Sequence, residues 1–392
     1  MGGRVSLHVT MKELRHASRI ARCASTLVGA GIVDRVMVTG IVGGSANEFA
    51  RPARGVAYLR LALRSKGLPR VILAQAVKEL ERTWIVVGIA RRVRPVTVSA
   101  RSAWDLPCAY LAARFTGAAL IYEPHELESG RVGMGRFRSA VVRAIEWAFG
   151  RRAAACVAVG ECIAERYSRQ LGIPCFTVMN VPDPSPRLPV AGLRDRCGCP
   201  PGEPLLAYVG ALVGGRGLGR LARGVGLSRR RWRLAAIGPG SLDEASAVAL
   251  RGHGWVLGPV APAEVASVVA DADLSAVLIE PVCESYRLSM PNKLFESLRA
   301  GVPVLASDLP ELGGFVRRHG VGALVAPDAS PEELAKTLDA ITPDQLERWR
   351  AAIPAALADA SGRHGPSTLA AAYRVAMAAC GRCRGGRALG GN

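Results

Sequence analysis

A short polar stretch ahead of a predicted helix has the composition of a phosphate-binding site. In SMPNKLFESLRAGVPVLASD, Pro291 suits the first helical position, where its missing N–H costs nothing. The backbone amides of Ser289, Met290 and Asn292 would then be free at the start of the helix. The amine of Lys293 would lie beside them. Because the helix dipole also attracts anions to this end, we expect the stretch to bind phosphate.

A carboxylate, Glu296, lies further along the same predicted helix. It could accept hydrogen bonds from the ribose hydroxyls of a nucleotide whose diphosphate rests at the helix start. Leu294 and Leu298 supply an apolar face, and Gly301 ends the helix. Residues 302–306 are short and apolar, as is typical of a buried parallel strand. The pattern therefore predicts a nucleotide site at the edge of a parallel sheet.

Residues 284–311 resemble the donor-binding segment of GT-B glycosyltransferases, specifically the retaining family 4 enzymes, and the resemblance rests on SMPNKLFESLRAGVPVLASDLPEL. It implies an α/β fold with two Rossmann-like parallel-sheet domains that face a cleft. It also implies a retaining, hexosyl-transferring enzyme that uses a nucleotide-diphosphate sugar as donor and requires no cofactor or metal. The alternative is an ordinary α/β repeat with a polar helix start.

The resemblance assigns roles to further residues. His125 follows a predicted strand at 118–122 and would face the donor sugar, with Glu123 in place of the family's aspartate. Arg216 matches a basic residue that neutralises the leaving diphosphate, which a guanidinium can bridge. Gly238 opens a Gly-Pro-Gly turn that suits close approach of a base or ribose.

Three further positions depart from the family pattern. Family members carry a glutamate eight residues before the one that matches Glu296, and Leu288 stands there in this chain. Glu284 could reach the same place if the loop folds back, which would make it the second catalytic candidate. Ala211 replaces a basic residue, and Arg101 stands where relatives carry a histidine. The sugar and the acceptor contacts are therefore left open.

The 392 residues have room for two α/β domains with a sizeable core in each. We expect an acceptor-side domain at 1–185 and a nucleotide-sugar-binding domain at 186–364. Prolines at 181–190 are typical of a linker between them. A helix at 365–379 is expected to cross back to the first domain, followed by a flexible tail at 380–392.

The charge of the chain is uneven. Residues 1–190 hold 28 Lys and Arg against 13 Asp and Glu, so they carry +15 of the total of +19. This surplus favours an anionic partner such as a phosphorylated or lipid-linked acceptor, an anionic membrane surface or nucleic acid. The predicted helices at 71–93 and 135–152 combine arginines with apolar residues, which suits either core packing or membrane docking. No recognition motif supports nucleic acid.

The ten cysteines are scattered, which favours buried thiols in a reducing compartment. Cys197 and Cys199 form a close pair, but no nearby histidine completes a zinc site. No secretory signal pattern opens the sequence and no apolar run reaches about 18 residues. We therefore expect a cytoplasmic protein with, at most, peripheral contact at the inner face of the cell membrane.

Two other functions remain compatible with the resemblance. The chain could be a catalytically idle GT-B paralogue that acts as a scaffold, or a sugar-nucleotide epimerase that needs no acceptor. The sequence does not name the donor base, the sugar, the acceptor or the oligomeric state.

Overall fold

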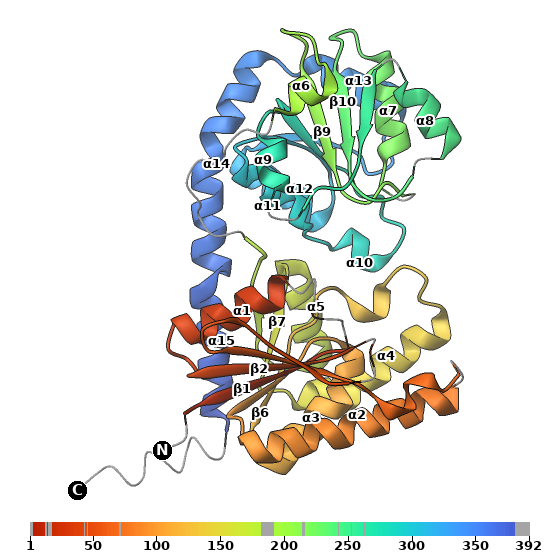
Figure 1. Cartoon of the computed structure of the whole chain (residues 1–392). Coiled ribbons are helices and arrows are strands. Elements are labelled where there is room, and N and C mark those ends of the chain that lie inside the picture. Colours follow the sequence, from red (N-terminus) through yellow and green to blue (C-terminus); the bar gives the residue numbers. More distant parts are fainter. Residues whose placement is uncertain are drawn as a thin grey trace, which may run out of the picture. The chain divides into compact units, whose positions relative to one another are not determined.

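The computed structural model describes residues 3–11, 14, 18–42, 44, 46–69, 72–181, 192–213, 216–241, 243–251, 253–261 and 264–380. The chain forms two compact units, shown in Figure 1. Unit 1 comprises Met1–Met179 and Gly362–Asn392, and unit 2 comprises Asn180–Ser361. The first boundary expected from the sequence, between 185 and 186, lies outside the described residues, and the second falls shortly after Ser361. Of the expected tail, only Cys380 is described.

In the described part of unit 1, an eight-stranded sheet has the order β3-β4-β2-β1-β5-β6-β7-β8. All neighbouring pairs are parallel except β3 and β4. Every residue of the central strands β1, β6 and β7 is buried because helices cover both faces of the sheet. The strands are β1 (Val5–Val9), β2 (Arg35–Ile41), β3 (Glu48–Ala53), β4 (Val56–Leu61), β5 (Thr97–Ala100), β6 (Ala119–Tyr122), β7 (Ala155–Ala158) and β8 (Cys175–Thr177).

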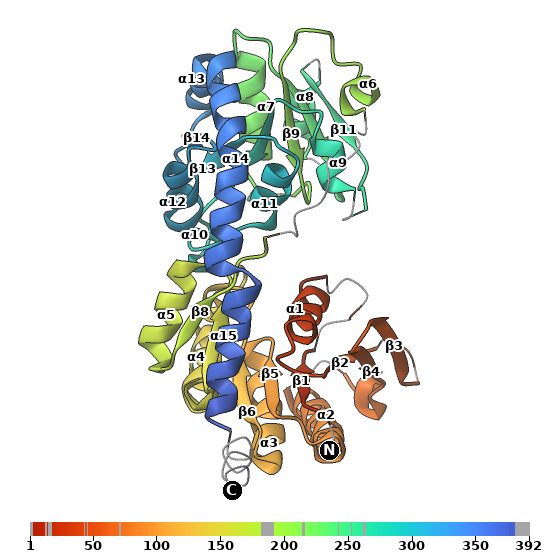
Figure 2. The ribbon, with the colours of Figure 1, turned by 90° about the vertical axis from the view of Figure 1, so that its left-hand side faces the viewer.

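The helices of unit 1 cover both faces of this sheet (Figures 1 and 2). One pair packs together on one side, and four neighbours follow one another on the other, as right-handed crossovers require. The pair is α1 (Ser18–Gly29) and α15 (Pro366–Ala378), and the four are α2 (Ile72–Val93), α3 (Leu106–Thr116), α4 (Arg136–Phe149) and α5 (Glu161–Leu171). Short 3-10 turns lie at Arg64–Gly67, Ala103–Asp105, Glu128–Gly130 and Gly150–Arg152.

The last described helix of the chain belongs to the core of unit 1. α15 packs against α1 and against β5 to β8. Its Tyr373 and Ala376 are fully buried and join the same apolar cluster as Leu27, Val38 and Ile121. Unit 1 is therefore completed by residues from both ends of the sequence.

In the described part of unit 2, a six-stranded parallel sheet has the order β11-β10-β9-β12-β13-β14. The fold class expected from the sequence, two parallel-sheet α/β units, is confirmed. The strands are β9 (Leu205–Val209), β10 (Arg233–Ile237), β11 (Gly254–Leu257), β12 (Leu274–Val277), β13 (Val304–Ser307) and β14 (Gly322–Val325).

The helices of unit 2 follow its strands in alternation. A capping box starts α13, since Ser330 and Glu333 each accept a hydrogen bond from the other's backbone amide. α14 starts in unit 2 and ends in unit 1. The helices are α6 (Leu193–Cys197), α7 (Leu218–Leu227), α8 (Glu244–Leu250), α9 (Val265–Val269), α10 (Glu284–Arg287), α11 (Asn292–Arg299), α12 (Pro310–His319), α13 (Pro331–Ala340) and α14 (Pro343–His364).

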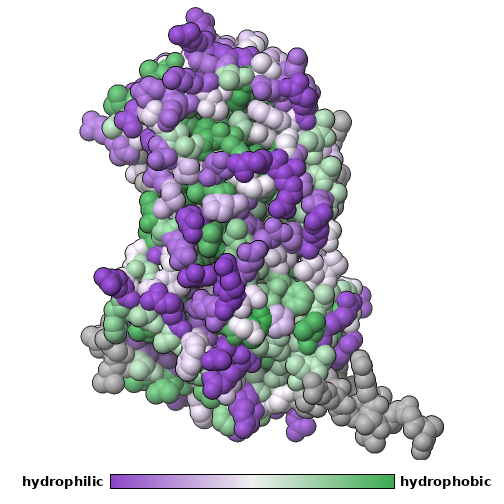
Figure 3. All heavy atoms as spheres, turned by 180° about the vertical axis from the view of Figure 1, so that it is seen from behind, coloured by the Kyte–Doolittle hydropathy of each residue, from purple (hydrophilic) through white to green (hydrophobic). Residues whose placement is uncertain are grey.

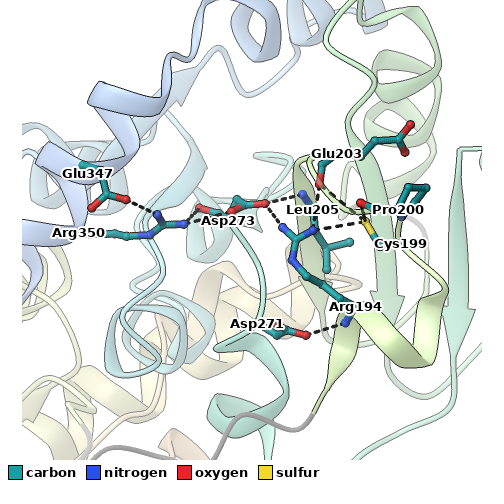
Figure 4. Close-up of polar contacts among 9 residues, drawn as sticks. All are labelled: Arg194, Cys199, Pro200, Glu203, Leu205, Asp271, Asp273, Glu347 and Arg350. Carbon is teal, nitrogen blue, oxygen red and sulfur yellow. Dashed lines mark hydrogen bonds and ion pairs between the residues drawn. The ribbon is translucent and has the colours of Figure 1, made fainter.

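An ionic network fastens α6 and α14 to the amino-terminal edge of the unit 2 sheet (Figure 4). Asp273, just before β12, pairs with Arg194 of α6 and, at 3.3 Å, with Arg350 of α14. The same carboxylate accepts a hydrogen bond of 2.8 Å from the amide of Leu205. The Sγ atom of Cys199 lies 3.6 Å from Arg194 within this network. These residues have a structural role in the packing of unit 2.

Hydrophilic and hydrophobic side chains are interspersed on the face of the molecule shown in Figure 3. Apolar residues at a protein surface are ordinary when they are scattered. In the described ranges, no helix is both long enough and apolar enough to cross a bilayer.

Candidate functional site

The carboxyl-terminal ends of β9 and β10 form one wall of the candidate site. Ligands in open parallel sheets bind at this edge, where strand order reverses direction around β9 and β12. The chain leaves β9 at Gly210, with φ of 140°, and leaves β10 at Gly238, with φ of 152°. A Cβ atom on Gly238 would lie 2.0 Å from the carbonyl oxygen of Gly210. Glycine is required at Gly238 because the two loops pack backbone to backbone.

Lys293 of α11 extends across this glycine pair. It lines a pocket of about 210 Å³ together with Gly210, Gly238 and Glu296. A Cβ atom on Gly210 would overlap the Lys293 side chain, so the glycine makes room for the lysine. The Nζ atom lies 4.1 Å from the centre of the Tyr208 ring and has no hydrogen-bond partner among the described residues. The site thus holds a cation with unused donors.

Burial, and then the neighbouring Arg216 cation, lower the pKa of Lys293 to about 7, against the opposing effect of Glu296. At neutral pH the amine is therefore divided between its charged and neutral forms. An anion placed in the pocket would favour the charged form, because it would supply the opposite charge that the buried amine lacks.

Glu296 lies in the same pocket, one turn of α11 after Lys293. Residues three apart share a helix face, so the carboxylate and the amine project toward the same space. Apolar groups of Val260 and Val265 line the other side of this pocket. The combination offers a cation, a hydrogen-bond acceptor and an apolar wall, which are the groups that a nucleotide needs.

The start of α11 differs in two respects from the expectation. Pro291 is the N-cap residue rather than the first helical residue. The amide of Ser289 is not free, since it donates to the carbonyl oxygen of Tyr286 at 3.2 Å. This hydrogen bond closes the turn before α11, and the helix pattern in the sequence did not indicate it. The amides of Met290 and Asn292 make no hydrogen bond to a described residue, and they remain available at the helix start.

Arg216 is held beside α10. Its guanidinium donates to the hydroxyl of Tyr286 at 2.9 Å and stacks over that ring at 4.7 Å. Only one of its donors is used there, so others remain for a phosphate. Glu284 is the first residue of α10 and does not line the pocket of Lys293. Leu288 is buried, one turn later.

His125 lies in the loop after β6 of unit 1 and is half-buried. Glu123, two residues earlier, is buried in the core of unit 1. Glu123 pairs with Arg101 at 2.9 Å and accepts hydrogen bonds from Ser99 at 2.6 Å and Tyr373 at 2.5 Å. Arg101 is 1% exposed. At the position where relatives carry a histidine, Arg101 therefore uses its charge inside the fold.

Three residues near the donor pocket were missed by sequence reasoning. The Tyr208 ring lies against the Lys293 amine, and the Tyr286 hydroxyl accepts a hydrogen bond from Arg216. Gly210 leaves room for the Lys293 side chain. Neither tyrosine belongs to a recognisable motif, because each acts through a contact with a distant element. The glycine directly after the β9 strand was a usable signal for a close approach of two backbones.

A second hollow of about 600 Å³ lies where α7 and α8 begin. Arg220 and Glu280, which both line it, form an ion pair of 3.0 Å. Arg220 also donates to the carbonyl oxygen of Ala329 at 2.7 Å.

Among the described residues, no group of three or more His, Cys, Asp or Glu side chains is arranged to hold a metal ion.

Part of the chain matches a known family model, and the fold as a whole matches solved structures. Residues 203–344 match the family model described as Glycosyl transferases group 1. No curated protein is similar enough in sequence to be recognised as a relative. Three solved structures share the fold over nearly the whole chain.

The first is sucrose-phosphate synthase from Thermosynechococcus elongatus, with 15% identity and a TM-score of 0.70 over 94% of this chain and 96% of that chain. The second is a glycosyltransferase from Rickettsia africae, with 14% identity and a TM-score of 0.68 over 95% and 97%. The third is HepE from Anabaena in complex with UDP and glucose, with 15% identity and a TM-score of 0.67 over 94% and 97%.

Proposed function

Since this chain has the GT-B fold and its residues 203–344 match the family model of glycosyl transferases group 1, we propose that it transfers a sugar from a nucleotide-sugar donor to an acceptor hydroxyl. The observation that carries the proposal is the pocket of unit 2 in which the Lys293 amine and the Glu296 carboxylate lie together. The donor diphosphate would contact Lys293, Arg216 and the free amides of α11. The ribose would contact Glu296, with its base near Gly238.

The main requirement of such a site is to stabilise the negative charge that develops on the departing diphosphate. Two cations and the start of α11 would stabilise this charge, which favours dissociation of the sugar–phosphate bond. We propose that transfer occurs with retention. His125 and Glu284 are the proposed contacts of the transferred sugar.

Donor binding is tested first, with a panel of nucleotide sugars and thermal unfolding as the readout. UDP sugars head the panel because the similar Anabaena structure contains UDP. A donor present at about 100 times its Kd stabilises the folded state by about 2.7 kcal/mol. We expect Lys293→Gln and Glu296→Gln to reduce this shift. Lys336→Gln, which removes an exposed lysine from the same unit, is the matched control.

Transfer is tested next by product analysis with donor alone and with candidate acceptors. His125→Ala should lower kcat and leave donor binding nearly unchanged. If neither His125→Ala nor Glu296→Gln affects the turnover of an active preparation, the assignment of these residues is wrong. A changed sugar formed from donor alone would identify an epimerase, and donor binding without turnover would favour the scaffold.

We further propose that the acceptor is lipid-linked and that unit 1 contacts the cytoplasmic face of an anionic membrane. The support is the exposure of large apolar groups on two helices that also carry arginines. On α2, Leu80 is 70% exposed and Trp84 is 79% exposed, and on α4, Phe137 is 77% exposed and Trp147 is 62% exposed. Tryptophan at a bilayer interface is favourable because its ring is apolar and its N–H is polar.

Liposome flotation with anionic vesicles at low and high salt tests this contact. We expect binding at low salt that falls in Leu80→Ser/Trp84→Ser. Leu227→Ser, at an exposed leucine of unit 2, is the control. Absence of binding to anionic vesicles at low salt would contradict the membrane proposal without affecting the donor site.

A further inference from the structure

A hollow of about 1310 Å³ lies at the amino-terminal edge of the unit 1 sheet. The first residues of β1, β2 and β4 line it. β3 runs antiparallel to β4, so the end of β3 reaches the same edge. α2 runs back along the sheet before β5, and its last turn arrives there too. This is the edge opposite the one that carries His125.

Among the described residues that line this hollow, every charged side chain is an arginine and none is Asp or Glu. The nearest acid in sequence, Asp34, accepts a hydrogen bond of 2.5 Å from the backbone amide of Arg4. The six arginines are Arg4, Arg35, Arg51, Arg54, Arg92 and Arg94.

These guanidinium groups are almost unused by the fold. Arg4 donates to the carbonyl oxygen of Gly31 at 2.8 Å, and Arg51 lies 5.5 Å from the centre of the Phe49 ring. For the other four, no ion pair or side-chain hydrogen bond joins the guanidinium to a described residue. Like charges that lie close together without counter-charges repel one another and destabilise a fold. A bound anion would relieve this repulsion among the arginines around the hollow.

Arg94 adds a second observation. It follows α2 with φ of 48°, in the left-handed region that normally takes glycine at the end of a helix. Its amide donates to the carbonyl oxygen of Ala90 at 2.8 Å, as an end cap does. The backbone conformation is strained for a residue with a side chain, and the residue that adopts it is an arginine in the lining of the hollow.

We propose that this hollow is a binding site for a chain of linked phosphates, such as inorganic polyphosphate, separate from the donor site. Its volume exceeds the range of about 300–1,000 Å³ that is usual for one small ligand, so an extended anion fits better than a single phosphate. Arginine donors match phosphate oxygens in pairs. A flat bilayer does not enter a concavity. Of the described residues in the lining, Phe49 alone is aromatic, which leaves little for nucleic-acid bases to stack on.

Calorimetric titration of the full chain with tripolyphosphate at about 50 and 300 mM salt tests the proposal. We expect binding that weakens with salt and that falls by at least about tenfold in Arg51→Gln/Arg54→Gln. Arg94→Gly should weaken binding and at the same time raise thermal stability, because glycine relieves the strained backbone. A merely structural Arg94 would not show this pair of effects.

The control is Arg136→Gln/Arg138→Gln, which removes the same charge from exposed positions of α4. An equal loss of binding in the control would mean a net-charge effect and would overturn the proposal. So would unchanged binding in Arg51→Gln/Arg54→Gln. Tighter hollow-dependent binding of a single-stranded oligonucleotide, a polyglutamate peptide or phosphatidylglycerol vesicles would overturn it in favour of that ligand.

Discussion

Lys293 is buried at its amine and yet has no carboxylate within hydrogen-bond distance among the described residues. Its lowered pKa follows from this position. A donor diphosphate would restore the charged form, so donor binding should be coupled to protonation.

At pH 8 an amine with a pKa of about 7 is mostly neutral, so binding of a nucleoside diphosphate should take up close to one proton. At pH 6 the amine is already charged and uptake should be small. Affinity should therefore fall, by up to about tenfold for each pH unit above 7. Calorimetry in two buffers of different ionisation enthalpy measures the uptake. Persistence of the uptake in Lys293→Gln would exclude Lys293 as its source.

Gly238 and Gly301 illustrate two different reasons why a backbone position requires glycine. Both have positive φ, of 152° and 77°. A Cβ atom on Gly238 meets the Gly210 carbonyl oxygen at 2.0 Å, whereas one on Gly301 meets nothing within 4 Å. Gly301→Ala should cost about 1 kcal/mol of unfolding free energy, and Gly238→Ala should cost at least about 2 kcal/mol. Urea unfolding compares them, and equal costs would mean that the two loops separate easily.

At the scale of elements, α15 is the part of the chain that most depends on distant contacts. Its Tyr373 hydroxyl donates to Glu123 at 2.5 Å and lies 3.0 Å from the Nε2 atom of His8. The helix is thereby joined to β1, which carries His8, and to Glu123, the residue after β6. Removing the hydroxyl leaves the carboxylate with Arg101 and Ser99 as partners.

Tyr373→Phe should therefore lower the unfolding free energy of unit 1 by about 1–3 kcal/mol, since a buried acceptor loses a donor. Tyr110→Phe is the matched control, because its hydroxyl makes no hydrogen bond to a described residue and the ring packs on Phe149. Chemical unfolding measures both. A Tyr373→Phe cost no larger than that of the control would mean that water replaces the lost bond.

At the scale of the whole molecule, the buried cluster of His8, Arg101 and Glu123 makes unit 1 sensitive to acid. Burial, and then Arg101, lower the pKa of His8 to about 3. Burial alone would raise the pKa of Glu123, but Arg101, His8 and two hydrogen bonds hold it below its usual value. Both groups therefore bind protons more readily in the unfolded chain, and both contributions to stability are lost as pH falls.

For His8 the loss begins near pH 6.5, the usual pKa of the unfolded residue, and continues toward pH 3. Between pH 7 and pH 5 it should amount to about 2 kcal/mol of unfolding free energy. Denaturant unfolding at the two pH values measures it. His8→Gln should flatten this dependence, and an unchanged dependence would assign the acid sensitivity to other groups.

Much of the fold was predictable because local patterns agreed with it. The apolar runs of β6 and β7, the glycines that end helices and the capping box at Ser330 all act within a few residues. The hairpin of β3 and β4 was missed. β3 is an exposed edge strand, so burial does not impose the alternation that marks a strand in sequence.

The sequence by itself determined the class of fold, the order of most elements and the stretch at 289–296, since spacing along one helix places a cation and a carboxylate on one face. Only the tertiary structure decided the state of those groups. The closed turn at Ser289, the Tyr208 ring beneath Lys293 and the commitment of Arg101 to the core arise between elements distant in sequence. Burial and pairing set the charge of a side chain, and neither is encoded by its near neighbours.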